Sequence, residues 1–144
     1  MESWLSLVLR NDLSELERMA QAVSAWCEGN SVPADTEFQV NLALDEIVSN
    51  IKRYGWKDKG EHQIQVRVYR LESELTVEVE DDAVPFNPLE VPAPDIARPL
   101  EDRSIGGLGI HLVRQIMDSL AYRRHDGNNL LSMKKKMGGV QSRA

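Results

Sequence analysis

Apolar side chains recur every three or four positions in three parts of the chain, which is the spacing of a helix face packed on a core. The first part follows the capping pair Asn11–Asp12 and is expected to stop at Gly29–Asn30 through a left-handed residue. The second opens at Pro33–Asp35 and ends at Gly55, and the third begins after Gly109. The pattern therefore predicts three helices, with apolar stripes at Leu13, Leu16, Met19, Ala20, Val23; Val40, Ala43, Leu44, Ile47, Val48, Ile51; and Ile110, Val113, Ile116, Met117, Leu120.

Apolar and polar residues alternate in other stretches, as they do in strands with one buried face. Two such runs, Ile64–Val68 and Leu75–Val79, flank Glu72–Glu74 and predict a hairpin. Trp4–Leu9 predicts a first strand, and Leu130–Met137 predicts a last one after a turn at Asp126–Asn128. Three lysines on that last strand, Lys134, Lys135 and Lys136, suggest protection of a sheet edge.

The predicted order is strand, helix, helix, strand, strand, loop, helix, strand. This order favours an α+β fold, a two-layer α/β sandwich with a mixed sheet and helices on one face. We expect one domain over residues 1–137 and a disordered tail over 138–144. The proline-rich stretch Asn87–Arg103 predicts a long irregular loop, which in a compact domain is usually a functional cover or a disordered segment.

Composition narrows the classes of function. A net charge of −6 argues against broad binding to nucleic acid, which needs a basic face. The single cysteine, Cys27, cannot form an internal disulfide, which fits a reducing compartment. The sequence contains no apolar run long enough to span a membrane and no signal peptide at its start, so we expect a cytoplasmic protein.

Three short segments carry candidate chemistry. On the second predicted helix, Glu46 and Asn50 are four residues apart and therefore neighbours on one flank. The Asn50 carboxamide offers a neutral oxygen of the kind Mg²⁺ accepts beside phosphates and water, and Glu46 could deprotonate an attacking hydroxyl. Arg53 lies on the same side and could contact phosphate. Alone, this spacing is more typical of a solvated helix edge.

The second segment, Asp81–Phe86, follows the predicted strand Leu75–Val79 directly. A carboxylate at a strand end, walled by Pro85 and Phe86, suits recognition of an exocyclic amine such as that of adenine. Two aspartates before a proline are also common turn chemistry, so this segment alone favours a turn.

The third segment, Gly106–Ile110, precedes a strongly periodic helix. Glycines let the backbone approach phosphates closely, and free amides at a helix start attract anions. The segment is neither a P-loop, since no Gly-Lys-Ser/Thr follows, nor a dinucleotide fingerprint. The three histidines have no spacing typical of a metal site.

In this order the segments resemble the histidine-kinase-like (GHKL) ATPase superfamily, which includes gyrase and sensor-kinase ATP-binding domains. The resemblance runs from about Ser31 to Lys136. Residues 43–54 match the family's N-box, residues 81–88 its first glycine box in the Pro-Phe form, and residues 106–112 its second. The chain is most similar to bacterial anti-sigma factor serine/threonine kinases, which implies a Bergerat-type ATP-binding fold.

The resemblance implies a role for each matching residue. Glu46 would be the catalytic base, Asn50 the magnesium ligand, and Asp81 the acceptor for the adenine amine. The loop Asn87–Arg103 would be the ATP lid. The remaining expected contacts to the nucleotide are Arg53, Ala83, Phe86, Gly106, Gly107, Leu108, Gly109 and Ile110.

The chain departs from the family pattern at three positions. Ala83 occupies the place of the first-box glycine, Asn87 replaces the usual aspartate, and Tyr54 stands where many anti-sigma kinases have histidine. These departures weaken the expectation of full kinase activity more than that of nucleotide binding.

The resemblance implies ATP and Mg²⁺ as cofactors and phosphorylation of a serine on an anti-anti-sigma partner, together with binding of a sigma factor and formation of a homodimer. The alternative is a non-catalytic ATP-binding module that sequesters a protein partner. A fragment of a two-component histidine kinase is less favoured, because the first predicted helix contains no histidine.

Overall fold

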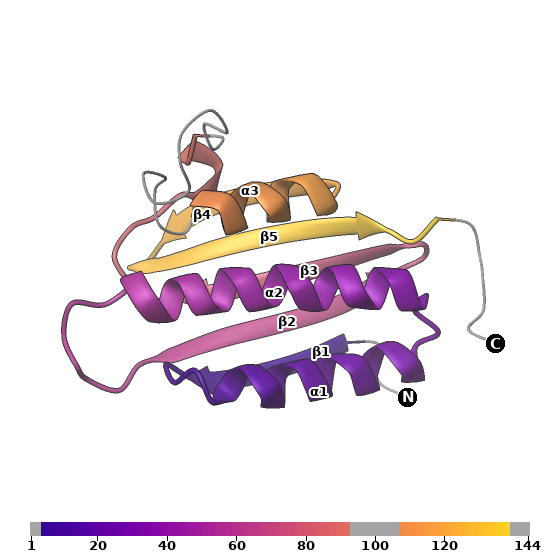
Figure 1. The fold of residues 1–144 in the computed structure, drawn as a ribbon, viewed down its shortest axis with the longest axis horizontal. Helices are drawn as coiled ribbons and strands as arrows, with labels where there is room; N and C mark the ends of the chain where they lie inside the picture. Colours follow the sequence, from indigo (N-terminus) through magenta and orange to yellow (C-terminus); the bar gives the residue numbers. More distant parts are fainter. Residues whose placement is uncertain (1–3, 93–106, 139–144) are drawn as a thin grey trace.

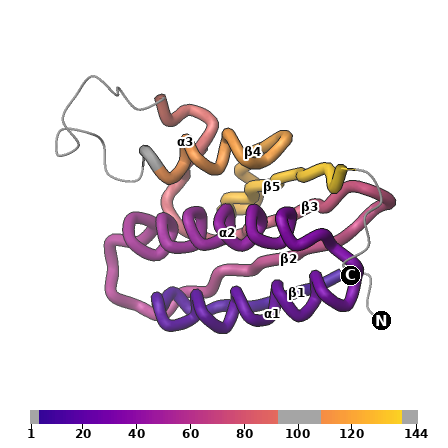
Figure 2. Tube along the Cα trace, turned by 45° about the vertical axis from the view of Figure 1, so that its right-hand side comes forward, coloured from indigo at the N-terminus to yellow at the C-terminus, as the bar shows by residue number. Residues whose placement is uncertain are grey.

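The computed structural model describes residues 4–92 and 107–138. In chain order the elements are β1 (Trp4–Arg10), α1 (Glu15–Gly29), α2 (Ala34–Tyr54), β2 (Gln63–Leu71), β3 (Glu74–Asp81), the 3₁₀ turn η1 (Pro88–Glu90), α3 (Gly107–Ile116), β4 (Ser119–His125) and β5 (Asn128–Lys136). Figure 1 shows α1 and α2 lying across one face of the sheet, with α3 beside α2. Figure 2 shows the same two layers from a second direction. The predicted α+β sandwich is confirmed.

The sheet has five strands in the order β1-β2-β3-β5-β4 among the described residues. Every neighbouring pair is antiparallel, so the expectation of a mixed sheet is wrong in that detail. The prediction also missed β4 and extended the third helix through Leu120, which instead belongs to that strand. The helix ends at Ile116, where Lys135 Nζ donates a hydrogen bond of 2.8 Å to the Ile116 carbonyl.

β5 lies between β3 and β4, so its lysines do not protect a sheet edge. Lys134 pairs with Thr76 in the β3–β5 register and reaches diagonally to Glu74, with 4.0 Å between Nζ and Oε1. Lys135 holds the end of α3 instead.

The antiparallel pairing of β2 with β3 places Asp81 on the core side of the sheet. Val66 pairs with Val79 and Ile64 pairs with Asp81, and both Val79 and Ile64 are buried under the helices. Because side chains alternate between the two faces of a strand, Asp81 points to the same face as Val79. Asp81 is the last residue of β3 and lies just beyond the predicted strand, which ended at Val79.

The core fills the space between the helices and this sheet face. Its fully buried side chains include Leu9, Met19, Leu44, Ile64, Leu75 and Met133. The predicted stop of the first helix is nearly right: α1 ends at Gly29, but the left-handed residue is Ser31, with φ of 56°, and not Gly29 or Asn30.

No helix within residues 4–92 and 107–138 is both long and apolar enough to cross a membrane. The predicted lid loop falls largely outside the described residues, as do Gly106 and nearly all of the predicted disordered tail.

Candidate functional site

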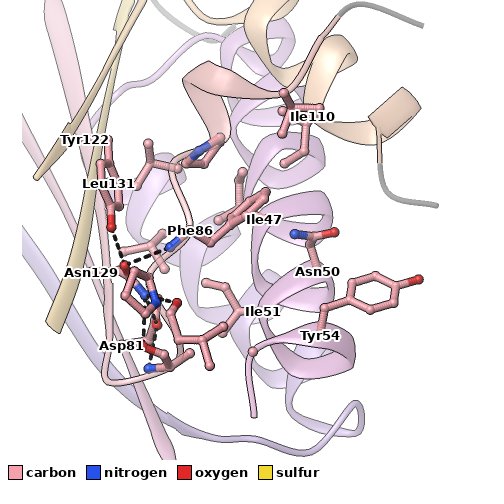
Figure 3. A pocket seen from close by; sticks show the side chains of 17 residues that line it. Ile47, Asn50, Ile51, Tyr54, Asp81, Phe86, Ile110, Tyr122, Asn129 and Leu131 are labelled. Atoms are coloured by element: carbon pink, nitrogen blue, oxygen red, sulfur yellow. Dashed lines mark hydrogen bonds between the residues drawn. The ribbon is translucent and has the colours of Figure 1, made fainter. Parts of the chain in front are cut away.

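A cavity of about 380 Å³ opens between α2, the end of β3 and β5 (Figure 3). This volume lies within the roughly 300–1,000 Å³ typical of small-molecule sites. The wall is mostly apolar, with a few polar groups that could fix a ligand's orientation. The described lining residues are Ile47, Asn50, Ile51, Tyr54, Gly55, Val79, Asp81, Ala83, Val84, Pro85, Phe86, Pro88, Val91, Ile110, Tyr122, Asn129 and Leu131.

Asp81 carries the only charged side chain among those described lining residues, and it is 5% exposed. Its Oδ1 accepts two hydrogen bonds of 2.9 Å, one from the Ala83 N–H and one from Asn129 Nδ2. Within the described part of the chain, no group donates to Oδ2. Burial raises the pKa of Asp81, while the hydrogen bonds from Asn129 and Ala83 oppose that rise. Asp81 can therefore accept a hydrogen bond from a ligand donor at the apolar end of the cavity.

Asn50 lies at a different part of the cavity rim from Asp81. In Figure 3, Ile47 and Ile51 point from α2 toward the sheet, whereas Asn50 and Tyr54 extend along the outer flank of the helix. The Asn50 carboxamide makes no hydrogen bond to any described residue. The cavity thus has an apolar end with a carboxylate and an open end with a carboxamide, and one bound molecule could reach both.

Glu46 lies one helical turn before Asn50 and faces the start of α3. A methyl group placed on Gly109 would overlap Glu46 Oε2 and lie 3.1 Å from Glu46 Cδ. The absence of a side chain at Gly109 is therefore what lets the Glu46 carboxylate approach α3. Gly107 and Leu108 belong to the first turn of α3, and Ile110, which is 2% exposed, lines the cavity.

Ala83, at the place of the family's glycine, has room for its methyl group. It is 4% exposed, and a methyl group placed on Gly55 would lie only 2.8 Å from Ala83 Cβ. The two positions are complementary in size, because Gly55 leaves the space that Ala83 fills. Phe86 is 40% exposed and lines the cavity.

Comparison with known families decides what kind of domain holds this cavity. The family described as histidine kinase-like ATPase domain matches residues 9–135, which is most of the chain. The chain belongs to this family. The match includes all three segments singled out in the sequence, and it confirms the family that they resemble.

Two curated relatives of this ATPase domain are named as protein kinases. The chain is 29% identical over 100 residues to serine/threonine-protein kinase BtrW of Bordetella bronchiseptica, covering 69% of this chain and 70% of that protein. It is 31% identical over 100 residues to serine-protein kinase RsbW of Bacillus mycoides, covering 66% of this chain and 61% of that protein. The match thus spans less than two thirds of the Bacillus kinase.

A solved structure shares the fold of the chain. The histidine kinase AdeS of Acinetobacter baumannii superimposes with a TM-score of 0.50 at 12% identity, covering 92% of this chain and 68% of that one. At this identity the likeness supports the fold alone.

Membership of an ATPase family implies that the chain binds ATP. The polar groups in and beside the cavity suit the base and the phosphates of that nucleotide. Asp81 offers an acceptor for an amino group among apolar side chains. The N-terminus of α3 begins at Gly107, and a helix N-terminus favours anions such as phosphate. No group of three or more His, Cys, Asp or Glu side chains in the described ranges is placed to hold a metal. Mg²⁺ usually takes only one or two protein oxygens and completes its shell with phosphates and water, so Asn50 suits it.

The structure separates Arg53 from the other predicted residues. Arg53 is exposed and borders a second hollow with Arg10, Lys52, Lys57 and Lys59, while the cavity with Asp81 does not include it. Its contact with phosphate stays a prediction, as do the roles of Glu46, Asn50 and the glycines.

Sequence reasoning missed Asn129 and Tyr122, which both line the cavity. Tyr122 lies in β4, a strand that the pattern did not predict. Asn129 follows the Asp126–Asn128 turn, where an asparagine suggests only turn chemistry. Their position depends on the pairing of β5 with β3 and β4, which no local signal encodes.

Proposed function

We propose that this protein is an ATP-dependent serine/threonine protein kinase that phosphorylates an anti-anti-sigma partner and also binds a sigma factor. Family membership and the two relatives named as kinases support the chemistry. The two partners, an anti-anti-sigma protein and a sigma factor, are inferred from the resemblance to anti-sigma kinases. The observation that carries the proposal is the position of the Glu46 carboxylate against Gly109, beside the cavity that Asn50 and Asp81 share.

Each residue has a distinct task in this proposal. Asp81 accepts a hydrogen bond from the adenine amine through its free oxygen, and the apolar wall excludes water from the base. Asn50 holds Mg²⁺, which when bound would neutralise charge on the phosphates. The first turn of α3, with Gly107, presents amides to the phosphates. Glu46 takes the proton of the attacking serine hydroxyl.

Phosphate transfer from labelled ATP to a serine of the candidate partner tests the proposal. The partner to use is a small anti-anti-sigma protein of the same organism, sought first among the neighbouring genes. Glu46→Gln keeps the shape of the side chain and removes the base, so we expect ATP binding without transfer. Asp45→Asn removes an exposed carboxylate from the adjacent position and should transfer phosphate as the wild type does. Transfer by Glu46→Gln at the wild-type rate would reject the assignment of the base.

A non-catalytic module is the second candidate. Ala83 and Asn87 depart from the family pattern and favour it, although Asn87 still accepts a hydrogen bond of 2.9 Å from the Leu89 N–H at the start of η1. This candidate predicts tight ATP binding with no transfer to any partner by the wild type itself. The assay above therefore separates the two functions.

We also propose a homodimer, as the resemblance implies. β1 is an edge strand, and its outer side exposes Trp4 by 53% and Val8 by 49%. An exposed apolar edge of this kind pairs readily with another chain. Sedimentation equilibrium of the wild type and of Val8→Lys should show a dimer and a weakened dimer, respectively; a monomeric wild type contradicts the proposal.

A further inference from the structure

The second hollow, which Arg53 borders, lies where the end of β1, the end of α2 and the loop from α2 to β2 meet. Its volume is about 590 Å³, and unlike the cavity with Asp81 it is lined mainly by polar groups. The charged lining residues are the cations Arg10, Lys52, Arg53, Lys57 and Lys59 and the acids Asp12, Asp58 and Glu61. This basic hollow stands out on a chain whose net charge is −6.

The cations of the basic hollow keep their charge available to an outside anion. None of the five side chains makes an ion pair or a hydrogen bond with any residue that the structure describes, whereas Arg67 on β2 pairs with two glutamates. Two of the acids are engaged by nearby backbone instead. Asp12 Oδ1 accepts from the Ser14 N–H at 2.9 Å, and Asp58 Oδ1 accepts from the Gly60 N–H at 2.7 Å.

The loop that carries Lys57 and Lys59 is braced from within the protein. The rings of Trp56 and His62 stack, with centroids 4.6 Å apart and an angle of 6° between their planes. Trp56 Nε1 also donates a hydrogen bond of 3.0 Å to Asp82 Oδ1 at the end of β3. The loop therefore presents its two exposed lysines from a fixed backbone beside the end of α2.

The backbone amides around the basic hollow are already used. The Asn11 N–H donates to the His62 carbonyl and the His62 N–H donates to Asn11 Oδ1, both at 3.0 Å. Sites for a compact phosphate usually converge backbone amides on the anion, and these amides are taken. Long cationic side chains spread along a rim suit separated carboxylates better. A long nucleic acid would also meet the acidic remainder of the surface.

The basic hollow adjoins the flank of α2 that carries the proposed chemistry. Glu46, Asn50 and Arg53 follow one another at spacings of four and three residues, so they lie along one side of the helix. Arg53 is only about 4.5 Å farther along the helix axis than Asn50. A protein held in the basic hollow is therefore close to the open end of the cavity.

We propose that the basic hollow docks an acidic segment of the protein whose serine this kinase modifies, and so brings that serine to Glu46. This inference rests on the proposed function. It adds to that function a recognition site outside the nucleotide cavity and a chemical feature of the substrate, a run of carboxylates near the modified serine.

The test reverses the charge of the two loop lysines, Lys57→Glu with Lys59→Glu, because neither residue lines the nucleotide cavity. Phosphate transfer from labelled ATP is measured against the concentration of the anti-anti-sigma partner. We expect KM for the partner to rise about tenfold, with kcat and the affinity for ATP unchanged. Arg123→Glu with Lys136→Glu makes the same change in charge at exposed positions of β4 and β5 and should leave KM within about twofold.

A direct binding measurement needs neither ATP nor transfer. The probe is a fluorescein-labelled octaglutamate peptide, followed by anisotropy, beside an oligothymidylate of equal length. We expect the wild type to bind octaglutamate the more tightly of the two, the loop variant to bind it about tenfold more weakly, and an ionic strength of about 0.5 M to abolish the difference.

The outcomes separate this inference from the proposed function. Transfer by the wild type, with an unchanged KM in the loop variant, overturns the docking site and leaves the kinase intact. Octaglutamate binding that is equal in both double variants, or weaker than oligothymidylate binding, also overturns it. Absence of transfer by the wild type overturns the proposed function and the delivery of a serine with it, whatever the peptide does. A raised KM and weakened peptide binding confined to the loop variant support the docking site.

Discussion

Replacing Gly109 by alanine tests whether the position of Glu46 matters for chemistry rather than for folding. A methyl group at this position would overlap Glu46 Oε2 and lie 3.1 Å from Glu46 Cδ. Carbon atoms pack at about 3.5–4.0 Å, so the carboxylate must move by about 1 Å or more. Because the displaced atoms are the end of a flexible side chain, the shift is cheap for the fold.

The expected consequence is a large loss of rate with little change in stability. A misplacement of about 1 Å in a catalytic group can cost about 10²-fold, which equals about 2.7 kcal/mol in the barrier. The free energy of unfolding should stay within about 1 kcal/mol of the wild type, since alanine is the better helix former. The added methyl group points at the Glu46 carboxylate and leaves the backbone of Gly109, which is the predicted phosphate contact, unchanged, so ATP affinity should change little.

The assay is single-turnover transfer of phosphate from labelled ATP, with calorimetry for ATP affinity and urea unfolding for stability. Gly138→Ala is the matched control, because a methyl group there meets nothing within 4 Å. A Gly109→Ala protein that transfers phosphate at the wild-type rate would refute the reasoning. So would a variant that loses stability and ATP affinity in parallel with its rate.

Three further predictions concern stability, each measured by urea unfolding. Hydrogen bonds from Arg18 and from a backbone N–H hold the pKa of Glu15 at about 2, below its unfolded value of about 4.3. The stability this adds is present above the unfolded pKa and is lost as pH falls through the folded pKa. Glu15→Gln should therefore be the less stable protein at pH 7, and its difference from the wild type should shrink as pH falls from about 4 through about 2. Leu44→Ala removes a fully buried side chain and should cost about 2–5 kcal/mol. Gly55→Ala places a methyl group against the Ile51 carbonyl oxygen and should cost about 1–3 kcal/mol.

Controls come from exposed positions on the same helices. Glu17→Gln removes an exposed carboxylate in the same first turn of α1 and is the matched control for loss of a charge there. Phe38→Ala truncates a side chain that is 68% exposed and should change stability by less than about 0.5 kcal/mol. Parallel pH curves for Glu15→Gln and wild type, or equal costs for Leu44→Ala and Phe38→Ala, would contradict the burial and pairing seen in the structure.

Local periodicity was sufficient to predict the elements that carry the three segments. The stripe on α2 runs uninterrupted from Val40 to Ile51, and β2 and β3 alternate cleanly about a short turn. The second segment begins at the end of β3 and the third lies at the start of α3, while the first lies in the second half of α2. Their approach to one another follows once the helices are placed on one face of the sheet. This is why the apolar cavity with Asp81 and Asn50 could be anticipated.

The fourth strand could not be found in the same way. β4 buries little, and its Leu120 falls on the helical stripe of the preceding residues. The helix stops at Ile116 because Lys135, on a strand later in the chain, holds its carbonyl, and Asp118 pairs its N–H with the Lys134 carbonyl. Such long-range contacts override local periodicity.

Contacts between distant positions decided the details of the site. Ala83 is accommodated by Gly55, which lies 28 residues earlier, and Asp81 is held by Asn129, 48 residues later. Strand register brings the second pair together, and the sequence specifies register only through the whole sheet. Residues of this kind become visible only in the folded chain.

Titration of the protein with ATP in the presence of Mg²⁺, in parallel with Asp81→Asn, tests the central claim most directly. The variant keeps the shape of residue 81 and replaces one carboxylate oxygen by an amide donor. Because burial raises the pKa of Asp81, the charged form costs stability at neutral pH, and the variant should unfold at no lower urea concentration. We predict saturable binding of ATP by the wild type and an affinity roughly 10–100-fold lower in Asp81→Asn. Equal affinity in the two proteins, or no binding by the wild type, would contradict the account.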